Sequence, residues 1–178
     1  MQKRELSAAG WAQTPQQDDE QYLRELMGHY GSDVKRVCLM YLKDVYLAED
    51  AAQETFVKAW RGLGSFRRES SERTWLMHIA VNVCRDMLRT PWMRRNDRHV
   101  PAEELLVNVP WLQEEHDITE AVLALPVRSR EVILLCCFQG LTMEEAARAL
   151  GISLAAVRSR LHRAKETLKT TIKEGWEA

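Results

Sequence analysis

Apolar residues recur at intervals of three and four along most of this chain, and this periodicity limits the folds open to it more than any other feature. Such spacing is typical of helices that bury one face. Only 8 Gly and 5 Pro interrupt the 178 residues, and the 46% of residues that are apolar suffice for a core. Residues 132–138 are ambiguous, because their spacing suits a strand as well as a helix. The sequence therefore predicts an all-α protein.

Three prolines within 20 residues, Pro91, Pro101 and Pro110, break the helical pattern in the middle of the chain. Proline has no backbone N–H to donate, so it seldom lies inside a helix. We therefore expect two small helical domains joined by a flexible linker, the second of them a helix-turn-helix domain. The expected division is a tail at 1–15, a first domain at 16–90, a linker at 91–115 and a second domain at 116–173.

The first domain is expected to contain four helices. Residues 22–42 have helical spacing and predict two helices that meet near residues 31–33. A long helix is expected over residues 72–89, because Pro91 stops it. The helix between them carries the apolar stripe Ala48, Ala52, Thr55, Phe56, Ala59, Trp60 and Leu63.

The second domain contains the pattern of a helix-turn-helix, in which a short helix, a tight turn and a longer helix follow one another. Thr142 and Glu145 have the spacing of a capping box in front of the short helix. Gly151 suits the turn, and Ser153 suits the N-cap of the next helix. On that longer helix the residues expected to face the core are Val157, Leu161, Ala164 and Leu168.

The other face of the longer helix carries the residues that we expect to contact duplex DNA: Arg158, Ser159, His162 and Arg163. The second helix of this motif usually enters the major groove, and arginine can bind guanine edges or phosphate with two hydrogen bonds. The alternative is an ordinary helical hairpin with a cationic, solvated face.

Charge is segregated along the chain, although its formal net value is only −1. Residues 61–98 carry nine basic and four acidic side chains, and residues 158–173 carry six basic ones against Glu166 alone. Residues 99–127 contain six acidic side chains and no Lys or Arg. We expect the two basic segments to face polyphosphate and the acidic one not to. Both basic segments could equally be solvated helix faces.

The basic segment of the first domain interleaves arginine with aromatic residues, a pattern suited to single-stranded nucleic acid. Bases stack on aromatic rings while arginines follow the backbone. The candidates for this contact are Phe66, Arg67, Arg73, Asn82 and Arg85. Asn82 could read a base or pair with backbone, and Trp75 is better explained as a core aromatic.

An acidic and amide patch lies opposite the apolar stripe of the preceding helix. Glu49 and Gln53, and Asp50 and Glu54, are pairs four residues apart. This patch suits docking to a basic protein surface or a plain solvated face.

Several classes of function are not expected. The four Cys lack metal-ligand spacing and lie in apolar stretches, which favours buried free thiols. Catalytic and phosphate-binding motifs are missing, so we expect no enzyme, no metal and no cofactor. Apolar runs are too short for a membrane span, and no secretory signal follows the first residues. A cytoplasmic protein without membrane insertion is therefore expected.

Both halves of the chain, over about residues 20–172, resemble extracytoplasmic-function (ECF) sigma factors of bacterial RNA polymerase. The matching motifs are Leu47–Trp60, Ser65–Phe66, Arg73–Asn82 with Asp86 and Arg89, Leu125–Leu135, Gly140–Ala147, Leu150–Ser153 and Val157–Ala164. The resemblance implies a factor that binds core RNA polymerase and promoter DNA and that an anti-sigma factor occludes. It also implies that the second domain recognises the −35 element as duplex, and that the first melts and reads the −10 element.

Site residues follow from the resemblance position by position. The polymerase clamp would contact Asp50, Gln53 and Glu54. A loop at 66–71 would capture a flipped base beside Asn82, and Arg158, Ser159, His162 and Arg163 would contact the −35 element. The linker would thread toward the RNA exit path.

The chain departs from the family pattern at two places. Pro91 and Trp92 interrupt the basic run after the long helix, and Ala155–Ala156 stand where many members carry Gly-Thr. A stand-alone helix-turn-helix regulator and a helical protein-binding adaptor are the alternative functions.

Overall fold

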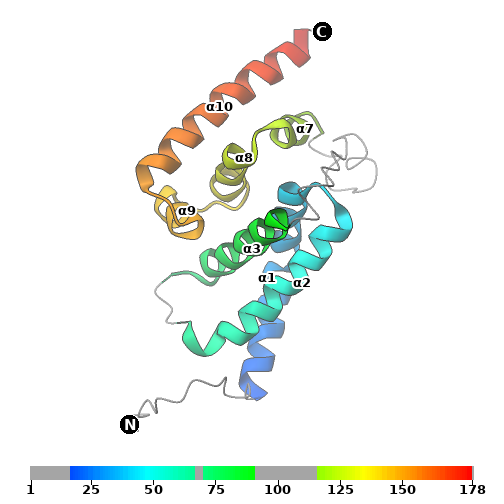
Figure 1. Ribbon diagram of the computed structural model, residues 1–178, viewed down its shortest axis with the longest axis vertical. Coiled ribbons are helices and arrows are strands. Elements are labelled where there is room, and N and C mark those ends of the chain that lie inside the picture. Colours follow the sequence, from blue (N-terminus) through cyan, green and yellow to red (C-terminus); the bar gives the residue numbers. More distant parts are fainter. Residues whose placement is uncertain (1–16, 67–69, 91–115, 178) are drawn as a thin grey trace.

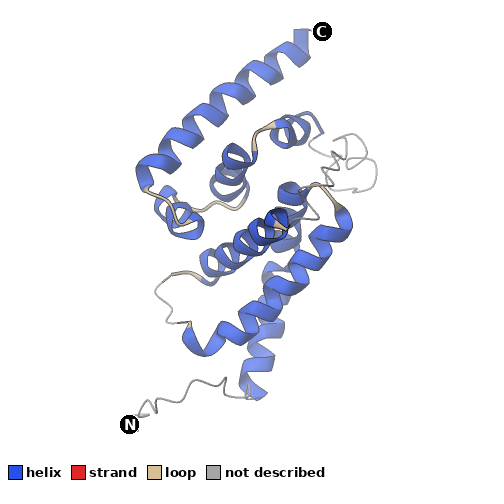
Figure 2. Cartoon of the chain, viewed as in Figure 1, coloured by secondary structure: helices blue, strands red, loops and turns tan. Residues whose placement is uncertain are grey.

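The computed structural model describes residues 17–66, 70–90 and 116–177. Within these ranges the chain forms helices and loops and no strand (Figure 2), as the periodicity predicts. Arg67, the tail at 1–15 and the linker at 91–115 lie outside the described residues. We call residues 17–90 the N-terminal module and residues 116–177 the C-terminal module.

The N-terminal module consists of three long helices packed on one another (Figure 1). They are α1 (Gln17–Leu42), α2 (Val45–Gly62) and α3 (Glu72–Arg89), with a short 3-10 turn at Leu63–Ser65 after α2. Asp44 caps α2 by accepting a hydrogen bond from the Leu47 N–H at 3.0 Å. Ser71 caps α3 in the same way through Thr74.

α1 is one continuous helix, so the expected break near residues 31–33 is wrong. A glycine inside a helix costs only about 1 kcal/mol relative to alanine. Leu26, Val34 and Val37 on either side of Gly31 are almost fully buried against the core. Burying these side chains along one helical face outweighs the local preference for a break.

The C-terminal module contains α7 (His116–Ala124), α8 (Val127–Ile133), α9 (Met143–Leu150) and α10 (Leu154–Glu177). The ambiguous segment proves helical, because α8 runs directly into a π-helical turn at Leu134–Phe138. Leu134 and Leu135 in this turn are buried. Burial of residues 132–135 explains most of this apolar run, whereas Cys137 at its end is exposed.

The local signals of the helix-turn-helix are confirmed. Thr142 and Glu145 form both hydrogen bonds of the capping box at the start of α9. Gly151 ends α9 with φ +63°, and Ser153 accepts a hydrogen bond from the Ala156 N–H at 3.2 Å. On α10, Val157 and Ala164 are buried, and Leu161 and Leu168 pack partly against the core.

The two modules pack against each other, with α9 lying against α3 and α8 contacting α1. α10 begins next to α9 and extends away to the C-terminal end of the molecule (Figure 1). Two helical units are present, as the predicted fold class requires, and they are in contact with each other.

Two glycine substitutions should change stability in opposite directions. Gly28→Ala, at an exposed helical position with nothing within 4 Å of the new Cβ, should stabilise the chain by about 0.5–1 kcal/mol. Gly151→Ala should destabilise it by about 1 kcal/mol or more, because alanine disfavours positive φ. Urea unfolding measures both changes. A Gly151→Ala protein as stable as the parent would contradict the left-handed turn.

Candidate nucleic-acid interface

The structure places the four expected duplex-contacting residues together on the exposed side of α10. Arg158, Ser159, His162 and Arg163 are all exposed. The Arg163 Nε donates only to the Ser159 carbonyl of its own helix, at 3.4 Å. The helix therefore offers a continuous cationic and polar face on the side opposite its buried residues.

A groove beside this face contains residues that sequence reasoning missed. Arg128 and Ser129 at the start of α8, together with Ser159 and Arg163, line a cavity of about 610 Å³. The missed residues follow Pro126, where the sequence signals only a helix start. Their proximity to α10 depends on how α8 packs, which local sequence does not encode.

The aromatic residues expected to stack on bases stack on each other. The rings of Phe66 and Trp75 are nearly parallel, with centroids 4.5 Å apart. Trp75 is half-buried and packs against the core, as expected for a structural aromatic. Phe66 is likewise only partly exposed, so the pair forms a small apolar platform at the start of α3.

Two expected strand-binding arginines on α3 contact the C-terminal module. Arg73 donates to Asp33 at 2.8 Å and to the Gln139 side-chain oxygen at 3.0 Å. Arg85 donates to both oxygens of Glu131, at 3.1 and 3.0 Å, and to the Leu150 carbonyl at 2.8 Å. Asn82 lies one turn before Arg85 and is half-buried. Arg73 and Arg85 thus face protein oxygens across the boundary between the modules.

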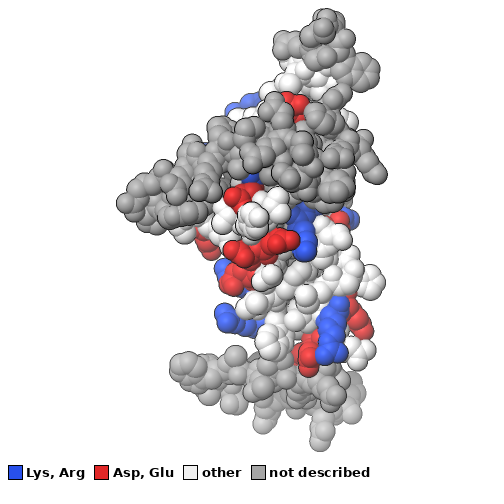
Figure 3. Space-filling model, turned by 90° about the vertical axis from the view of Figure 1, so that its right-hand side faces the viewer, with Lys and Arg blue, Asp and Glu red and all other residues white. Residues whose placement is uncertain are grey.

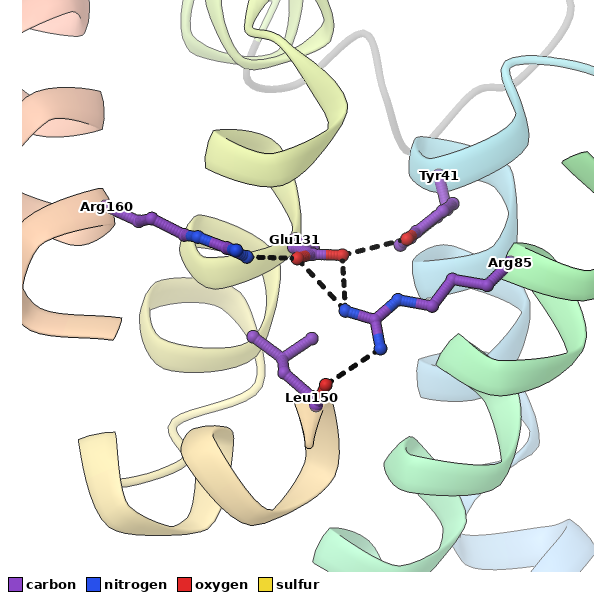
Figure 4. A network of polar contacts seen from close by, with 5 residues as sticks. All are labelled: Tyr41, Arg85, Glu131, Leu150 and Arg160. Carbon is purple, nitrogen blue, oxygen red and sulfur yellow. Dashed lines mark hydrogen bonds and ion pairs between the residues drawn. The ribbon is translucent and has the colours of Figure 1, made fainter. Parts of the chain in front are cut away.

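Glu131 is the centre of these contacts (Figure 4). Its side chain is only 2% exposed, and it accepts hydrogen bonds from Arg85, from Arg160 at 2.8 Å and from the Tyr41 hydroxyl at 2.9 Å. We call these four residues the Glu131 network. Burial raises the pKa of Tyr41 far above its usual value of 10.0, and the Glu131 charge raises it further. The hydroxyl therefore remains a hydrogen-bond donor at every physiological pH.

A second contact joins the modules near the start of α9. The Thr74 hydroxyl donates to Glu145 Oε1 at 3.0 Å. The Thr142 N–H donates to the other oxygen of Glu145 at 2.9 Å. Sequence reasoning recognised Glu145 as a cap but could not assign it a partner 71 residues away.

The expected polymerase-binding patch lies on the outer side of α2. Asp50 and Gln53 are exposed, and Glu54 is partly exposed beside Lys58, with a 3.9 Å separation between the charged atoms. Figure 3 views the molecule from the right-hand side of Figure 1, where α2 lies, and shows acidic side chains gathered at mid-height.

Exposed apolar residues extend this patch along α2. Tyr46, Val57 and Trp60 are 81%, 37% and 39% exposed. They alternate with Asp50 and Gln53 at steps of four and three, so all five form one stripe on the helix. Placing Trp60 in the buried stripe was wrong, because α2 turns its indole outward while Ala59 faces the core.

Cysteine exposure differs from the expectation at two positions, Cys136 and Cys137. Cys38 and Cys84 are buried free thiols, Cys136 is half-buried and Cys137 is exposed. Burial, together with the neighbouring Cys137, raises the pKa of Cys136 to about 11.

Among the described residues no group of His, Cys, Asp and Glu has the arrangement of a metal site. Nor does any helix in the described ranges have the length and apolarity to span a membrane.

Comparisons with known proteins match both modules. A Sigma-70 region 2 model matches residues 26–94, and a Sigma-70, region 4 model matches residues 115–168. The RNA polymerase sigma factor YlaC of Bacillus subtilis is 32% identical over 168 residues, which cover 87% of this chain and 94% of YlaC. The ECF RNA polymerase sigma factor SigC of Mycobacterium tuberculosis is 34% identical over 132 residues, covering 72% of this chain and 71% of SigC.

A longer relative and a solved structure extend these matches. The probable RNA polymerase sigma factor RfaY of Xanthomonas campestris is 34% identical over 153 residues, and the match spans 78% of this chain but only 37% of RfaY. The structure of CnrH in complex with the cytosolic domain of CnrY superposes with a TM-score of 0.66 and 26% identity. That superposition covers 87% of this chain and 90% of CnrH.

The contacts of Glu145 predict a pH-dependent stability. Its hydrogen bonds with the Thr142 backbone and the Thr74 hydroxyl hold the pKa of Glu145 below its usual 4.5. The resulting stabilisation is fully present above that usual value, and it is lost as pH falls through the lowered value in the folded chain. Thermal melts of Glu145→Gln from pH 7 to pH 3 should show a shallower acid loss than the parent. Glu144→Gln, at an exposed neighbour, is the control and should follow the parent.

Proposed function

Since this chain belongs to the ECF sigma factors of the sigma-70 family, we propose that it directs core RNA polymerase to promoters through three surfaces, on α10, α3 and α2. It acts by binding, as a transcription initiation factor, and we assign no catalytic step to its residues. Its place of action is the cytoplasm, where bacterial promoters and core polymerase are found.

The exposed cationic face of α10 is the observation that carries this proposal. Arg158, Ser159, His162 and Arg163 would enter the major groove of the −35 element, with the buried residues of α10 fixing the angle of the helix. Arg158 and Arg163 provide planar donors suited to guanine edges or phosphate. Arg128 and Ser129 line the adjoining groove, where they can add contacts to the DNA backbone.

The surface around α3 is proposed to hold the −10 element after the strands separate. Phe66 would offer a ring for base stacking beside Trp75, and Asn82 would read a base edge. Arg67, Arg73 and Arg85 would follow the phosphate backbone. A separated strand suits this surface better than duplex, because its unstacked bases can reach the aromatic pair.

The stripe on α2 is proposed to bind core polymerase. Its steps of three and four match the contact spacing of one helix packed along another. Tyr46, Val57 and Trp60 would supply apolar contact area, and Asp50, Gln53 and Glu54 would pair with basic and polar groups of the partner. An aromatic and acidic stripe of this kind fits a basic helical surface on the polymerase.

We also propose that an anti-sigma factor regulates this chain. CnrH, whose structure superposes over most of the chain, is bound to the cytosolic domain of CnrY. Such a partner would cover surfaces that the polymerase and promoter need.

Run-off transcription with purified core polymerase tests the proposed function. The full chain should produce a promoter-specific transcript that core enzyme alone does not. Arg158→Ala and Arg163→Ala should each weaken binding to −35 duplex by about 1–3 kcal/mol and lower the transcript yield. Arg24→Ala, an exposed arginine on α1 outside every proposed surface, is the matched control.

The outcomes separate the alternatives. A stand-alone regulator would bind duplex without supporting transcription, and a protein-binding adaptor would show no salt-dependent DNA affinity. Full affinity in both arginine variants would exclude α10 as the recognition helix.

Charge reversal on α2 should weaken polymerase binding. Asp50→Lys with Glu54→Lys places cations against the expected basic surface, so the affinity for core enzyme should fall at least about ten-fold. Glu20→Lys with Glu25→Lys reverses two exposed charges on α1 and serves as the control. Fluorescence anisotropy with core polymerase measures both pairs. Equal losses in the two pairs would show a general charge effect rather than a docking surface.

A further inference from the structure

A cavity of about 390 Å³ between α3, α8 and α10 has a strongly cationic wall. Four arginines line it against a single carboxylate, that of Glu131, and they are Arg85, Arg89, Arg128 and Arg160. The lining therefore carries a formal excess of three positive charges. We propose that this cavity binds a small ligand that carries two or more phosphate groups and an aromatic or apolar part, such as a nucleoside diphosphate.

Two of the four arginines are already paired, and two are available to a ligand. Arg85 and Arg160 bind Glu131, at 3.0 and 2.8 Å (Figure 4). Within the part of the chain that the structure describes, Arg89 and Arg128 form no hydrogen bond or ion pair, and both are exposed. Cations around one cavity repel each other and concentrate anions from solution. An anion bound between Arg89 and Arg128 would offset this repulsion.

The size of the charge excess favours a ligand with more than one phosphate group. A guanidinium group binds phosphate through two parallel hydrogen bonds, so each unpaired arginine can hold one phosphate group. The second pKa of a terminal phosphate is about 6, so a diphosphate ester carries about three negative charges at pH 7. Such a ligand matches the formal excess of the wall, whereas a monovalent anion leaves most of it uncompensated.

The remaining wall of the cavity suits an apolar or aromatic group. Leu88, Val127 and Ile152 line it beside the arginines. All three keep contact with water, and Val127 is 36% exposed. Covering apolar surface that is still hydrated favours binding. The cavity volume also falls within the roughly 300–1,000 Å³ that is typical of small-molecule sites.

A ligand in this cavity would be held by both modules at once. Arg89 ends α3 in the N-terminal module, and Arg128 lies at the start of α8 in the C-terminal module. The site is complete only while α3 and α8 are packed together. A ligand that binds only this folded arrangement stabilises it by mass action, so saturating ligand should raise the melting temperature of the chain.

Calorimetric titration of ADP into the full chain tests the site. At about 0.15 M salt, where attraction between exposed charges is largely screened, we expect ADP to bind with one-to-one stoichiometry. Arg89→Ala and Arg128→Ala should each weaken this binding at least about ten-fold, because each removes hydrogen bonds between charged groups. Arg24→Ala, an exposed arginine outside the cavity, is the matched control and should bind like the parent. Absence of ADP binding, or equal losses in all three variants, overturns the proposal.

A variant of the apolar wall separates the two parts of the site. Val127→Ala should weaken ADP binding about three-fold, because it removes apolar contact area. Its affinity for inorganic pyrophosphate, which has no apolar part, should equal that of the parent. Adenosine, which lacks phosphate, should bind far more weakly than ADP. Pyrophosphate that binds the parent as tightly as ADP would contradict the apolar part of the site.

DNA phosphates offer the arginines the same chemistry, and duplex binding distinguishes this source from a free ligand. Arg89 lies outside the proposed duplex-binding face of α10, so Arg89→Ala should keep the parent affinity for −35 duplex while it loses ADP. A ten-fold loss of duplex affinity in Arg89→Ala would assign the cavity to DNA and contradict a free ligand. The ADP titration needs neither polymerase nor promoter, so its failure leaves the proposed function intact.

Discussion

A carboxylate that is almost completely removed from water needs cationic or hydrogen-bonding partners, and Glu131 takes them from three helices. Its partners are Tyr41 on α1, Arg85 on α3 and Arg160 on α10. An unpaired charge at this position would cost several kcal/mol. The packing of α8 against the N-terminal module and against α10 therefore depends on the Glu131 network, and so does the placement of α10 relative to α3.

The same chemistry that suits Arg73 and Arg85 to nucleic acid suits them to this internal contact. Guanidinium groups bind phosphate and carboxylate oxygens with similar geometry. The arginines that we propose to bind an anionic strand can consequently also bind carboxylate and carbonyl oxygens of their own chain. In the described structure the exposed face of α10 and the stripe on α2 remain accessible, while α3 is engaged. The three surfaces that we propose for this sigma factor are thus unequally exposed.

Most of the local structure could be predicted from the sequence, and the errors have identifiable causes. The capping box at Thr142, the turn at Gly151 and the bounds of α3 follow from interactions within a few residues. The break expected near Gly31 failed because burial of Val34 and its neighbours outweighs the helix cost of glycine. Trp60 was placed inside because apolar character was equated with burial, although a helix that binds a partner also carries apolar residues on its outer face.

What the sequence determined by itself is most of the helices, the caps of α9 and α10 and the family to which the chain belongs. These depend on side-chain periodicity and on contacts between residues close together in the chain. Tertiary structure alone decided which groups satisfy Glu131, and that Arg85 faces a partner 46 residues away rather than solvent. Such pairings depend on how α3, α8 and α10 pack in three dimensions. A buried charge must be paired, but only the groups that this packing brings close to Glu131 can pair with it.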